Sequence, residues 1–451
     1  MKYLVAAVFL LRVVFSTLPA FQIDQNAFRY WSARLADSGP ANFYSKEVFT
    51  DNPVGYLYIL WGAGEFKKYF LPDLSYFSSE FDMFIKLPIS LVDIGTGLLI
   101  YLILRKKLKE WQARFSFLLY TLNPALVFNS TVFGQFDGIA IFLMFLAVYL
   151  MLSKKRPALS AIAFALAWAV KPQAIFLAPA LGLLLLLTTK PFKWLVFGAV
   201  FILTVLVIFF PFFPKEPFYG PIYVNGQSIG LFSCTTCFGF NLWGVWGNWQ
   251  NDLKLFLNIP LVWWGIILMS LSFIPIFFLR PFRIRFKEPY FYLVSAVSIM
   301  AFFMLLTRMH ERYVLYFLPF LLTAAFLIKS KFLWGFYLCS SFLILLNLYL
   351  PYTYYNEQMK LTSGLAVWLS ANFSKLSLVG FGSFLLLLCW YLFNCHSRPD
   401  RGSSVLSVTA KSLDSRLHGN DKEKKTQPRK TTSFEAKAFS WSRREIIIVF
   451  L

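Results

Sequence analysis

An acidic side chain opens the first long polar stretch of the chain. Asp24 follows an apolar run that ends near residue 21, at the start of the sequence IDQNAFRYW. A carboxylate at a membrane surface can act as a general base toward a hydroxyl group. A second acid, Asp51, follows in the sequence TDNPVGYLY. An acid in a solvated loop is the competing interpretation of Asp24, and the residue types alone leave both open.

Aromatic residues accompany these two acids. Trp31 and Tyr56 lie in the same stretch, together with Tyr30, Tyr58 and Trp61. Their rings could stack on the faces of sugars. An aromatic belt at a membrane interface is a more common reason for such residues and is the favoured interpretation.

A second polar cluster occupies the sequence NPALVFNSTVFGQFDG, residues 123–138. Gly134 predicts a turn there, and Asp137 would stand near the start of the next helix. Asp137 could simply cap that helix. Alternatively, Gln135 and Asp137 could hydrogen-bond a polar substrate or hold the first polar stretch, and the two interpretations have equal weight.

A lysine interrupts a long apolar region at the sequence KPQ, residues 171–173. Pro172 predicts a helix break, and Lys171 at membrane depth is costly unless it is paired or functional. Lys171 could bind a lipid phosphate, or its ammonium group could reach the membrane surface as a solvated charge.

A short polar segment with alternating charges, TRMHERY, separates two strongly apolar runs. Arg308, His310 and Arg312 surround the single acid Glu311. Arginine forms forked hydrogen bonds to phosphate oxygens, and a histidine can add another donor. The segment therefore predicts a phosphate site, with a structural salt-bridge cluster as the alternative.

The stretch 213–258 is rich in glycine, proline and aromatic residues. Its Cys234-x-x-Cys237 pair could be a small disulfide, a redox pair or two residues without function. Trp243, Trp246 and Trp249 follow at three-residue spacing. An interfacial amphipathic segment is favoured over a sugar-binding platform.

The composition places these clusters in a membrane protein. Of 451 residues, 58% are apolar and 14% are charged, against roughly a quarter charged in soluble domains. A soluble domain could not bury so much apolar surface, so we predict an all-α polytopic membrane protein. Candidate spans, about twelve by the length that crosses a bilayer, lie near 3–21, 84–104, 114–128, 137–152, 157–170, 172–187, 192–212, 259–280, 289–306, 313–328, 330–350 and 376–393.

Alternate connections between these spans differ in charge. One set is short and basic, which predicts a cytoplasmic location: 105–114, 153–156, 188–193, 280–287 and 329–331. The other set would lie outside: 22–83, 129–136, 171–173, 213–258, 307–312 and 351–375. The net charge of +21 thus comes largely from cations in short connections, where they indicate the orientation of the chain in the membrane. No nucleic-acid partner is therefore predicted. We expect a multi-pass protein of a bacterial inner (plasma) membrane whose polar clusters face the periplasm or outside.

The composition changes abruptly after residue 395. Residues 396–451 are polar, basic and poor in aromatics, which predicts disorder. The segment resembles a translated intergenic repeat, for which an accidental tail is favoured over a regulatory or lipid-binding one. The predicted domains are therefore a membrane bundle over 1–395 and a tail over 396–451.

Taken in order, the polar clusters resemble the GT-C superfamily of membrane glycosyltransferases, which take a sugar from a polyprenyl phosphate. IDQNAFRYW, TDNPVGYLY, NPALVFNSTVFGQFDG, KPQ and TRMHERY are similar to the motif order of bacterial relatives of the second GPI mannosyltransferase and of the dolichyl-phosphate-glucose glucosyltransferases. The likeness covers roughly residues 1–350. It departs at TDNP, where DYPP is usual. It implies a GT-C-like bundle with a catalytic first outer loop.

The resemblance also implies roles for single residues. Asp24 would be the catalytic base, His310 and Arg312 would bind the donor phosphate, and Asp51 would shape the acceptor site. The residues themselves add two sets to these roles: Arg308 and Lys171 at the phosphate, and Trp31, Tyr56, Gln135 and Asp137 at the acceptor or the first loop.

The sequence thus predicts an inverting hexosyltransferase that moves mannose or glucose from a polyprenyl-phosphate donor to a glycan, lipid or protein acceptor beside membrane lipid. A lipid or solute transporter or flippase and a polysaccharide polymerase are the alternatives. No cofactor is certain, because there is no P-loop or GxGxxG motif. A divalent metal is compatible with the chemistry, but no ligand cluster demands one, and no metal residues are predicted.

Overall fold

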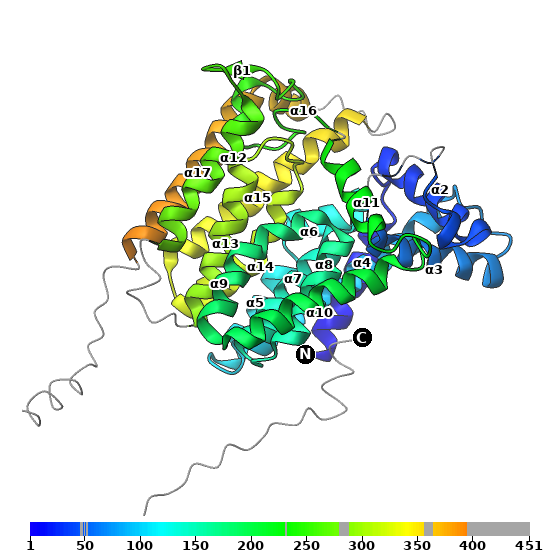
Figure 1. Cartoon of the computed structure of the whole chain (residues 1–451), viewed down its shortest axis with the longest axis horizontal. Coiled ribbons are helices and arrows are strands. Elements are labelled where there is room, and N and C mark those ends of the chain that lie inside the picture. Colours follow the sequence, from blue (N-terminus) through cyan, green and yellow to red (C-terminus); the bar gives the residue numbers. More distant parts are fainter. Residues whose placement is uncertain are drawn as a thin grey trace, which may run out of the picture.

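The structure of the chain is a computed structural model that describes residues 1–45, 48, 50, 53–230, 232–278, 288–355 and 364–394. Asp51 and the tail 396–451 therefore lie outside the described residues. The described part is mainly helical, and its strands β1 (Leu255–Phe256) and β2 (Ile259–Pro260) form a short antiparallel pair (Figure 1). The predicted all-α class is confirmed.

The helices follow one another with short connections. The first half contains α1 (Lys2–Ser16), α2 (Gln22–Ser38), η1 (Pro40–Asn42), α3 (Val54–Phe70), α4 (Ser79–Leu104), α5 (Glu110–Thr121), α6 (Pro124–Val127), η2 (Phe128–Phe133), α7 (Asp137–Leu152), α8 (Pro157–Val170), η3 (Pro172–Leu177), α9 (Ala178–Thr188) and α10 (Pro191–Phe209). The second half contains α11 (Tyr219–Gly230), η4 (Leu242–Trp246), α12 (Leu261–Phe273), η5 (Ile274–Phe278), α13 (Glu288–Leu305), η6 (Tyr313–Phe317), α14 (Leu318–Ile328), α15 (Lys331–Tyr355), α16 (Gly364–Ala371) and α17 (Phe373–Asn394).

Several helices have the length and composition of membrane spans. Within the described residues, five are long and apolar enough to cross a membrane, namely α4, α10, α13, α15 and α17. Shorter apolar helices, among them α7, α8 and α14, pack between them in the bundle. The chain is thus a multi-pass membrane protein, whereas the count of about twelve spans stays a prediction.

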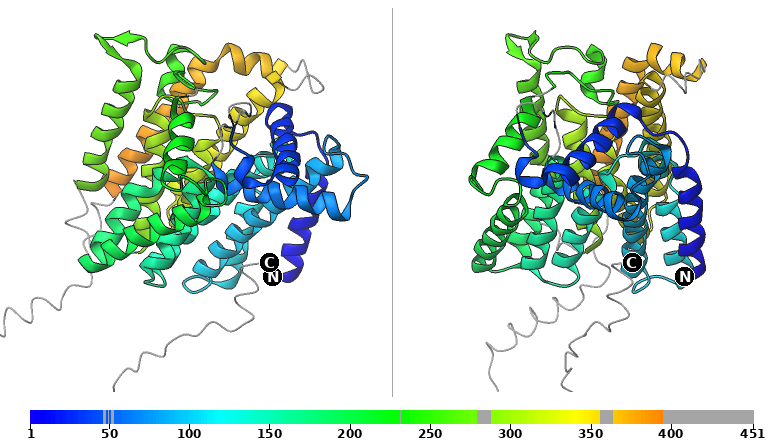
Figure 2. Two further views of the ribbon diagram at one scale, coloured as in Figure 1. Left: turned by 45° about the vertical axis from the view of Figure 1, so that its right-hand side comes forward. Right: turned by 90° about the vertical axis from the view of Figure 1, so that its right-hand side faces the viewer.

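The segment 22–83, predicted as an outer loop, is largely helical. It contains α2 and α3, which pack side by side at one edge of the bundle (Figures 1 and 2). Ser32 Oγ donates to Leu60 O at 2.7 Å across this pair. A Cβ added at Gly64 would lie 2.4 Å from Ser32 O, so only glycine permits this approach. The segment is thus helical and not an irregular loop, because hydrophobic residues of both helices share a core with α4, α7, α8 and α10; its location outside the membrane stays a prediction.

A buried ion pair attaches α1 to the bundle. Arg12 Nη1 lies 2.8 Å from Asp93 Oδ2 of α4 and donates to Ser130 Oγ of the π-helix η2 at 2.9 Å. Arg12 Nη2 donates to Thr121 O at 2.9 Å. Both charged side chains are almost fully buried. Arg12 interrupts the apolar run of α1 because it holds that helix against three other segments.

Breaks in the helices bring polar residues to one end of the bundle. Pro172 opens η3 directly after Lys171, and Gly134, at φ +84°, turns the chain before α7. Helix α7 leads away from that end, and α8 returns to it. The basic connection 153–156 therefore lies about 24 Å away, at 1.5 Å per residue of α7. Figure 2 likewise shows the N-terminus at the end opposite to β1 and α16.

Candidate functional site

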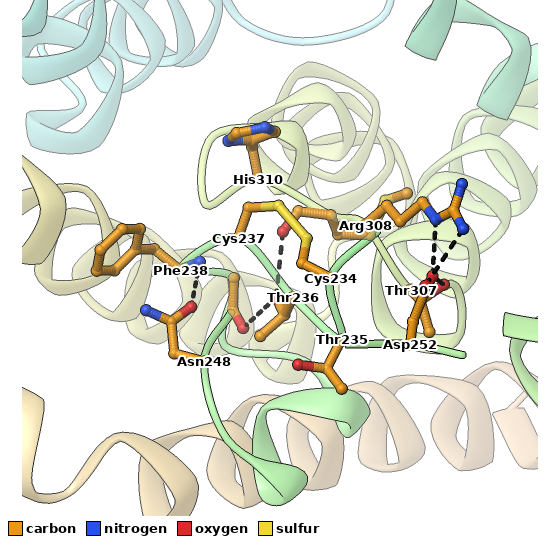
Figure 3. The surroundings of a disulfide bond; sticks show 12 residues. Cys234, Thr235, Thr236, Cys237, Phe238, Asn248, Asp252, Thr307, Arg308 and His310 are labelled. Carbon is orange, nitrogen blue, oxygen red and sulfur yellow. Dashed lines mark hydrogen bonds and ion pairs between the residues drawn. A yellow bond between two sulfur atoms is a disulfide. The ribbon is translucent and has the colours of Figure 1, made fainter. Parts of the chain in front are cut away.

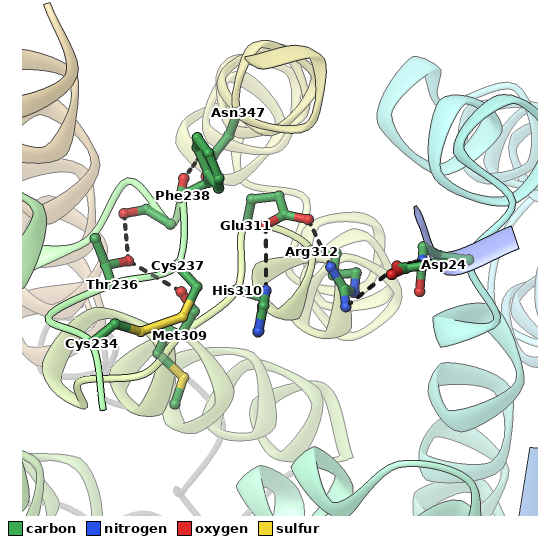
Figure 4. Close-up of polar contacts among 12 residues, drawn as sticks. Asp24, Cys234, Thr236, Cys237, Phe238, Met309, His310, Glu311, Arg312 and Asn347 are labelled. Atoms are coloured by element: carbon green, nitrogen blue, oxygen red, sulfur yellow. Dashed lines mark hydrogen bonds and ion pairs between the residues drawn. A yellow bond between two sulfur atoms is a disulfide. The ribbon is translucent and has the colours of Figure 1, made fainter. Parts of the chain in front are cut away.

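Charged side chains from distant parts of the sequence form one ionic cluster, defined here as Asp24, Asp137, Lys171, Glu311 and Arg312. Figure 4 shows Arg312 between Glu311 and Asp24. The Arg312 guanidinium lies at the centre of this cluster. Its Nη1 donates to Glu311 Oε1 at 2.9 Å. Its Nη2 is 3.9 Å from Asp24 Oδ2, and its Nε is 3.8 Å from Asp137 Oδ2. One cation thus faces three carboxylates.

Asp137 occupies the buried side of the ionic cluster. Its Oδ1 accepts a hydrogen bond of 2.7 Å from the Tyr316 hydroxyl and lies 3.7 Å from Lys171 Nζ. The Lys171 ammonium also lies 4.2 Å from the centre of the Phe136 ring, a cation–π distance. Asp137 stands in the first turn of α7 without making a side-chain cap. Its carboxylate therefore binds other segments in addition to its favourable position at the helix N-terminus.

Asp24 forms the more accessible edge of the cluster. It lies in the first turn of α2, where the helix dipole favours a negative charge. Its Oδ2 accepts a hydrogen bond from Gln135 Nε2. The Asp24 side chain is 27% exposed, against 0% for Asp137, so a polar group could approach the cluster from the Asp24 side.

Two polar atoms inside the cluster lack hydrogen-bond partners among the described residues. They are Asp137 Oδ2 and Arg312 Nε, which face each other across 3.8 Å. Both side-chain amide atoms of Gln25, a residue 1% exposed, likewise have no hydrogen-bond partner in the described part of the chain. A Cβ at Gly134 would lie 3.0 Å from Gln25 Oε1, which places this amide beside the turn before Gln135. Buried polar atoms of this kind normally bind water or a ligand.

The electrostatics of the loop between α13 and η6 keep Glu311 ionised. Burial opposes ionisation of this carboxyl, but the adjacent Arg312 guanidinium and the nearby His310 imidazole outweigh it and hold the pKa of Glu311 below its ordinary range. Burial likewise works against the charge of Arg312. The surrounding Glu311 and Asp24 carboxylates nevertheless raise the pKa of Arg312 well above its ordinary value. Both groups therefore remain charged at neutral pH.

His310 lies at the border between the ionic cluster and the segment 232–258. Its Nδ1 is 3.8 Å from Glu311 Oε2, and its ring contacts Tyr313 at 5.4 Å between centroids. Cys234 and Cys237 form a disulfide, so they are not two unconnected residues, and a structural or a redox role is compatible with this bond. Cys237 pairs with His310 in an isolated β-bridge, and Cys237 N donates to Met309 O at 2.9 Å (Figures 3 and 4).

Arg308 does not join the other predicted phosphate ligands. Its Nε lies 2.7 Å from Asp252 Oδ2, and its Nη2 donates to Asp252 Oδ1 at 3.2 Å. Thr307 Oγ1 donates to the same carboxylate at 3.0 Å. Figure 3 shows the Arg308 and His310 side chains pointing in different directions. The expectation that all three cations of this loop converge was wrong, because Asp252 binds Arg308 from the far side.

The predicted aromatic surface near Asp24 is buried. Trp31 is 2% exposed and lies in the core between α2 and α3. Tyr56 is fully buried and stacks on Phe136 with ring centroids 3.7 Å apart. Neither ring can receive a ligand, so both shape the packing of this segment. Asp51 lies outside the described residues.

Two partners of the site were missed in the sequence. Tyr316 follows Arg312 by four residues, and the 3-10 helix η6 directs its hydroxyl to Asp137. This spacing was visible, but it lay within an apolar run. Asp252, which binds Arg308, carries no local signal because its partner comes from a distant loop.

The described residues contain no group of three or more His, Cys, Asp or Glu side chains that could hold a metal ion. The carboxylates of Asp24, Asp137 and Glu311 converge on the Arg312 guanidinium instead. The chemistry that this arrangement can support is recognition of a charged group through fixed ionic contacts.

Comparison with known families adds an independent finding. A family model described as the GPI transamidase subunit PIG-U matches residues 4–213, just under half of the chain. A search of curated proteins found no match. The matched region contains Asp24, Gln135, Asp137 and Lys171, whereas His310 and Arg312 lie outside it.

This match corrects the interpretation drawn from the motif order. The family that matches is a transamidase subunit, and neither a GT-C glycosyltransferase nor any hexosyltransferase family. The predicted hexosyltransferase activity and its polyprenyl-phosphate sugar donor are therefore wrong, whereas the GT-C-like arrangement of the bundle stays a prediction. The match also lends no support to a bacterial inner membrane as the location. The structure does bring residues of most of these polar motifs together. Their order along the sequence, however, does not indicate sugar transfer.

Proposed function

We propose that this chain is a membrane subunit that binds the charged head group of a glycosylphosphatidylinositol-type (GPI-type) glycolipid and so serves the attachment of that lipid to proteins. The match to a GPI transamidase subunit over residues 4–213 carries the proposal. It does so because three members of the ionic cluster, Asp24, Asp137 and Lys171, come from the matched region.

The charges of the ionic cluster support this type of ligand. A GPI-type head group carries anionic phosphates and amines that are cationic at neutral pH. The cluster presents both signs, with the Asp24 carboxylate at its accessible edge and the Arg312 guanidinium behind it. The unpartnered atoms Asp137 Oδ2 and Arg312 Nε would gain hydrogen bonds from such a ligand. A lone phosphate fits less well, because each cation already faces a carboxylate.

The cysteines support a binding role rather than acyl transfer by this chain. Transfer through a covalent intermediate needs a nucleophile beside a base. Cys234 and Cys237 are joined in a disulfide. Cys339 and Cys389 are free and exposed on the apolar helices α15 and α17. In the described part of the chain no free cysteine adjoins a histidine, so another subunit would supply the nucleophile.

The topology belongs to the same proposal. With about twelve spans, the ionic cluster would face the side of the membrane opposite to the basic connections, as the charge pattern favours. Labelling of single cysteines introduced at the exposed positions 107 and 253 tests this directly. The two positions should react from opposite sides of sealed vesicles, and reaction from the same side would contradict the topology.

The experiment that tests the function measures lipid binding by the full chain in nanodiscs. A GPI lipid with phosphoethanolamine should bind more tightly than phosphatidylinositol. Arg312→Gln should weaken GPI binding about 10- to 100-fold, because a charge-assisted hydrogen bond contributes about 1.5–3 kcal/mol. Arg312→Lys keeps the positive charge and should retain part of the affinity. This variant therefore distinguishes an effect of the lost charge from an effect of misfolding.

The matched control is Arg114→Gln. Arg114 pairs with Glu110 at 2.9 Å, but its side chain is 48% exposed and belongs to α5, outside the ionic cluster. This variant should bind as the wild type does. Equal affinity for the two lipids, or unchanged GPI binding in Arg312→Gln, would contradict the proposed function.

A further inference from the structure

A cavity lies beside the ionic cluster and is not used by it. Its volume is about 530 Å³, within the range of small-molecule sites, and it is bounded by the segment 238–249, the end of α15 and the junction of α16 with α17. These elements meet at the end of the bundle where α16 is seen in Figure 1.

The lining of this cavity combines aromatic rings with neutral polar groups. Trp249 and Tyr354 remain 41% and 63% exposed, so their surfaces are open to a ligand. Phe238 and Phe373 contribute buried rings, and Ser374 adds a hydroxyl group. Among the described residues that line the cavity, none carries a charged side chain. A charged ligand would therefore lose hydration without gaining an ionic partner, which favours a neutral one.

The aromatic wall of the cavity is rigidly held. Phe238 and Trp249 have left-handed backbones at φ 63° and 55°, a conformation that bulky residues rarely adopt. Hydrogen bonds maintain it, from Trp249 N to Thr236 O at 3.0 Å and from Phe238 N to Asn248 Oδ1 at 2.7 Å. The disulfide closes the same segment (Figure 3). Strained backbone that the surroundings maintain in this way is concentrated at functional sites.

The cavity adjoins the loop that carries the ionic cluster. Phe238 pairs with His310 in an isolated β-bridge, and the Trp249 and His310 rings lie 6.3 Å apart between centroids. One ligand could thus reach from the ionic contacts around Arg312 to the aromatic wall.

We infer that this cavity binds the neutral carbohydrate part of the glycolipid. The C–H face of a pyranose is apolar and packs on aromatic rings, while its hydroxyl groups hydrogen-bond to neutral polar side chains such as Asn248 and Ser374. The Asn248 amide oxygen is engaged by Phe238 N, and its NH₂ group remains available within the described residues. The inference rests on the proposed function only in taking the ligand to be a glycolipid. The proposal takes up the sugar-platform alternative for Trp249 instead of the interfacial one.

The test uses lipid-free neutral oligosaccharides, α-linked mannotriose and maltotriose, with the full chain in nanodiscs. Saturation-transfer NMR detects binding, and titration gives the affinity. At least one saccharide should bind. Trp249→Leu should weaken that binding tenfold or more, and Ser374→Trp should do the same by filling the cavity without altering the strained segment.

Trp246→Leu is the matched control. Trp246 is 46% exposed in the same segment and does not line the cavity, so saccharide binding should be unchanged. Binding of neither saccharide, or full binding in both cavity variants, would overturn the inference. If saccharides fail to bind while GPI binding depends on Arg312, the proposed function stands without the cavity. If saccharide binding depends on Trp249 while GPI and phosphatidylinositol bind equally, the head-group function fails and the cavity stands.

Discussion

The buried pair between Arg12 and Asp93 provides a quantitative test of how the bundle is held. The two side chains are 0% and 1% exposed, and Arg12 also donates to Ser130 Oγ and twice to Thr121 O. Four segments therefore depend on one guanidinium. Arg12→Met and Asp93→Asn each leave the opposite charge buried without its partner.

The expected magnitude follows from that burial. Removing one partner of a buried ion pair typically costs about 3–5 kcal/mol, because the remaining charge is uncompensated. Replacing both partners restores neutrality. The double variant Arg12→Met/Asp93→Asn should therefore be less destabilised than the sum of the single variants by about 2–3 kcal/mol. The pair Arg114 and Glu110, about half exposed, serves as control and should change stability by about 1 kcal/mol or less.

Unfolding in mixed micelles, titrated with a denaturing detergent and followed by circular dichroism, measures these differences. Additive single and double variants, or single variants that cost less than about 1 kcal/mol, would refute the reasoning. Such a result would mean that water reaches Arg12 and that α1 is attached to the bundle mainly by apolar packing.

Four further outcomes are expected. The lowered pKa of Glu311 means that its ionisation stabilises the fold fully above the unfolded value of about 4.3 and that this contribution is lost as the pH falls toward the folded value. Glu311→Gln should therefore flatten the pH dependence of stability below that point, as thermal unfolding would show. Lys171→Met should weaken GPI binding about tenfold, because Asp137 loses its nearest ammonium group; an unchanged dissociation constant would exclude Lys171. Reduction of the bond between Cys234 and Cys237 should lower saccharide binding, since it constrains the aromatic wall, and reoxidation should restore it. Removal of 398–451 should leave membrane insertion and GPI binding intact, because its polar composition predicts no packed structure; loss of binding by an inserted truncation would show otherwise.

Much of the fold was predictable because hydrophobicity is a local property. The apolar runs at 137–152 and 157–170 coincide with α7 and α8. The break at Pro172 also needed no tertiary information, since proline lacks the amide hydrogen that a continuing helix requires. The segment 22–83 was different. Its helices α2 and α3 are stabilised by contacts with each other and with α4, α7, α8 and α10, which no local pattern reveals.

The sequence identified most residues of the ionic cluster, but it did not predict which of them contact each other. Asp24, Gln135 and Asp137 were identified because polar residues are costly between apolar runs unless they have a role. Which charges meet is a property of the tertiary fold. Arg308 and Arg312 are four residues apart in one loop, yet Asp252 binds the first, and the ionic cluster surrounds the second. Residue type and spacing could not distinguish these two arginines.

The error about sugar transfer has a physical origin that extends to other membrane proteins. Any protein that receives a charged lipid head group needs acids and cations at one membrane surface, helix breaks that expose them, and a short loop between long apolar helices. Asp24, the break at Lys171 and the loop around Arg312 meet those requirements whether or not a bond is made or broken. Asp24 accepts a hydrogen bond from Gln135 and faces Arg312 at 3.9 Å, so its carboxylate is held at the accessible edge of the ionic cluster, where it can pair with a cationic group.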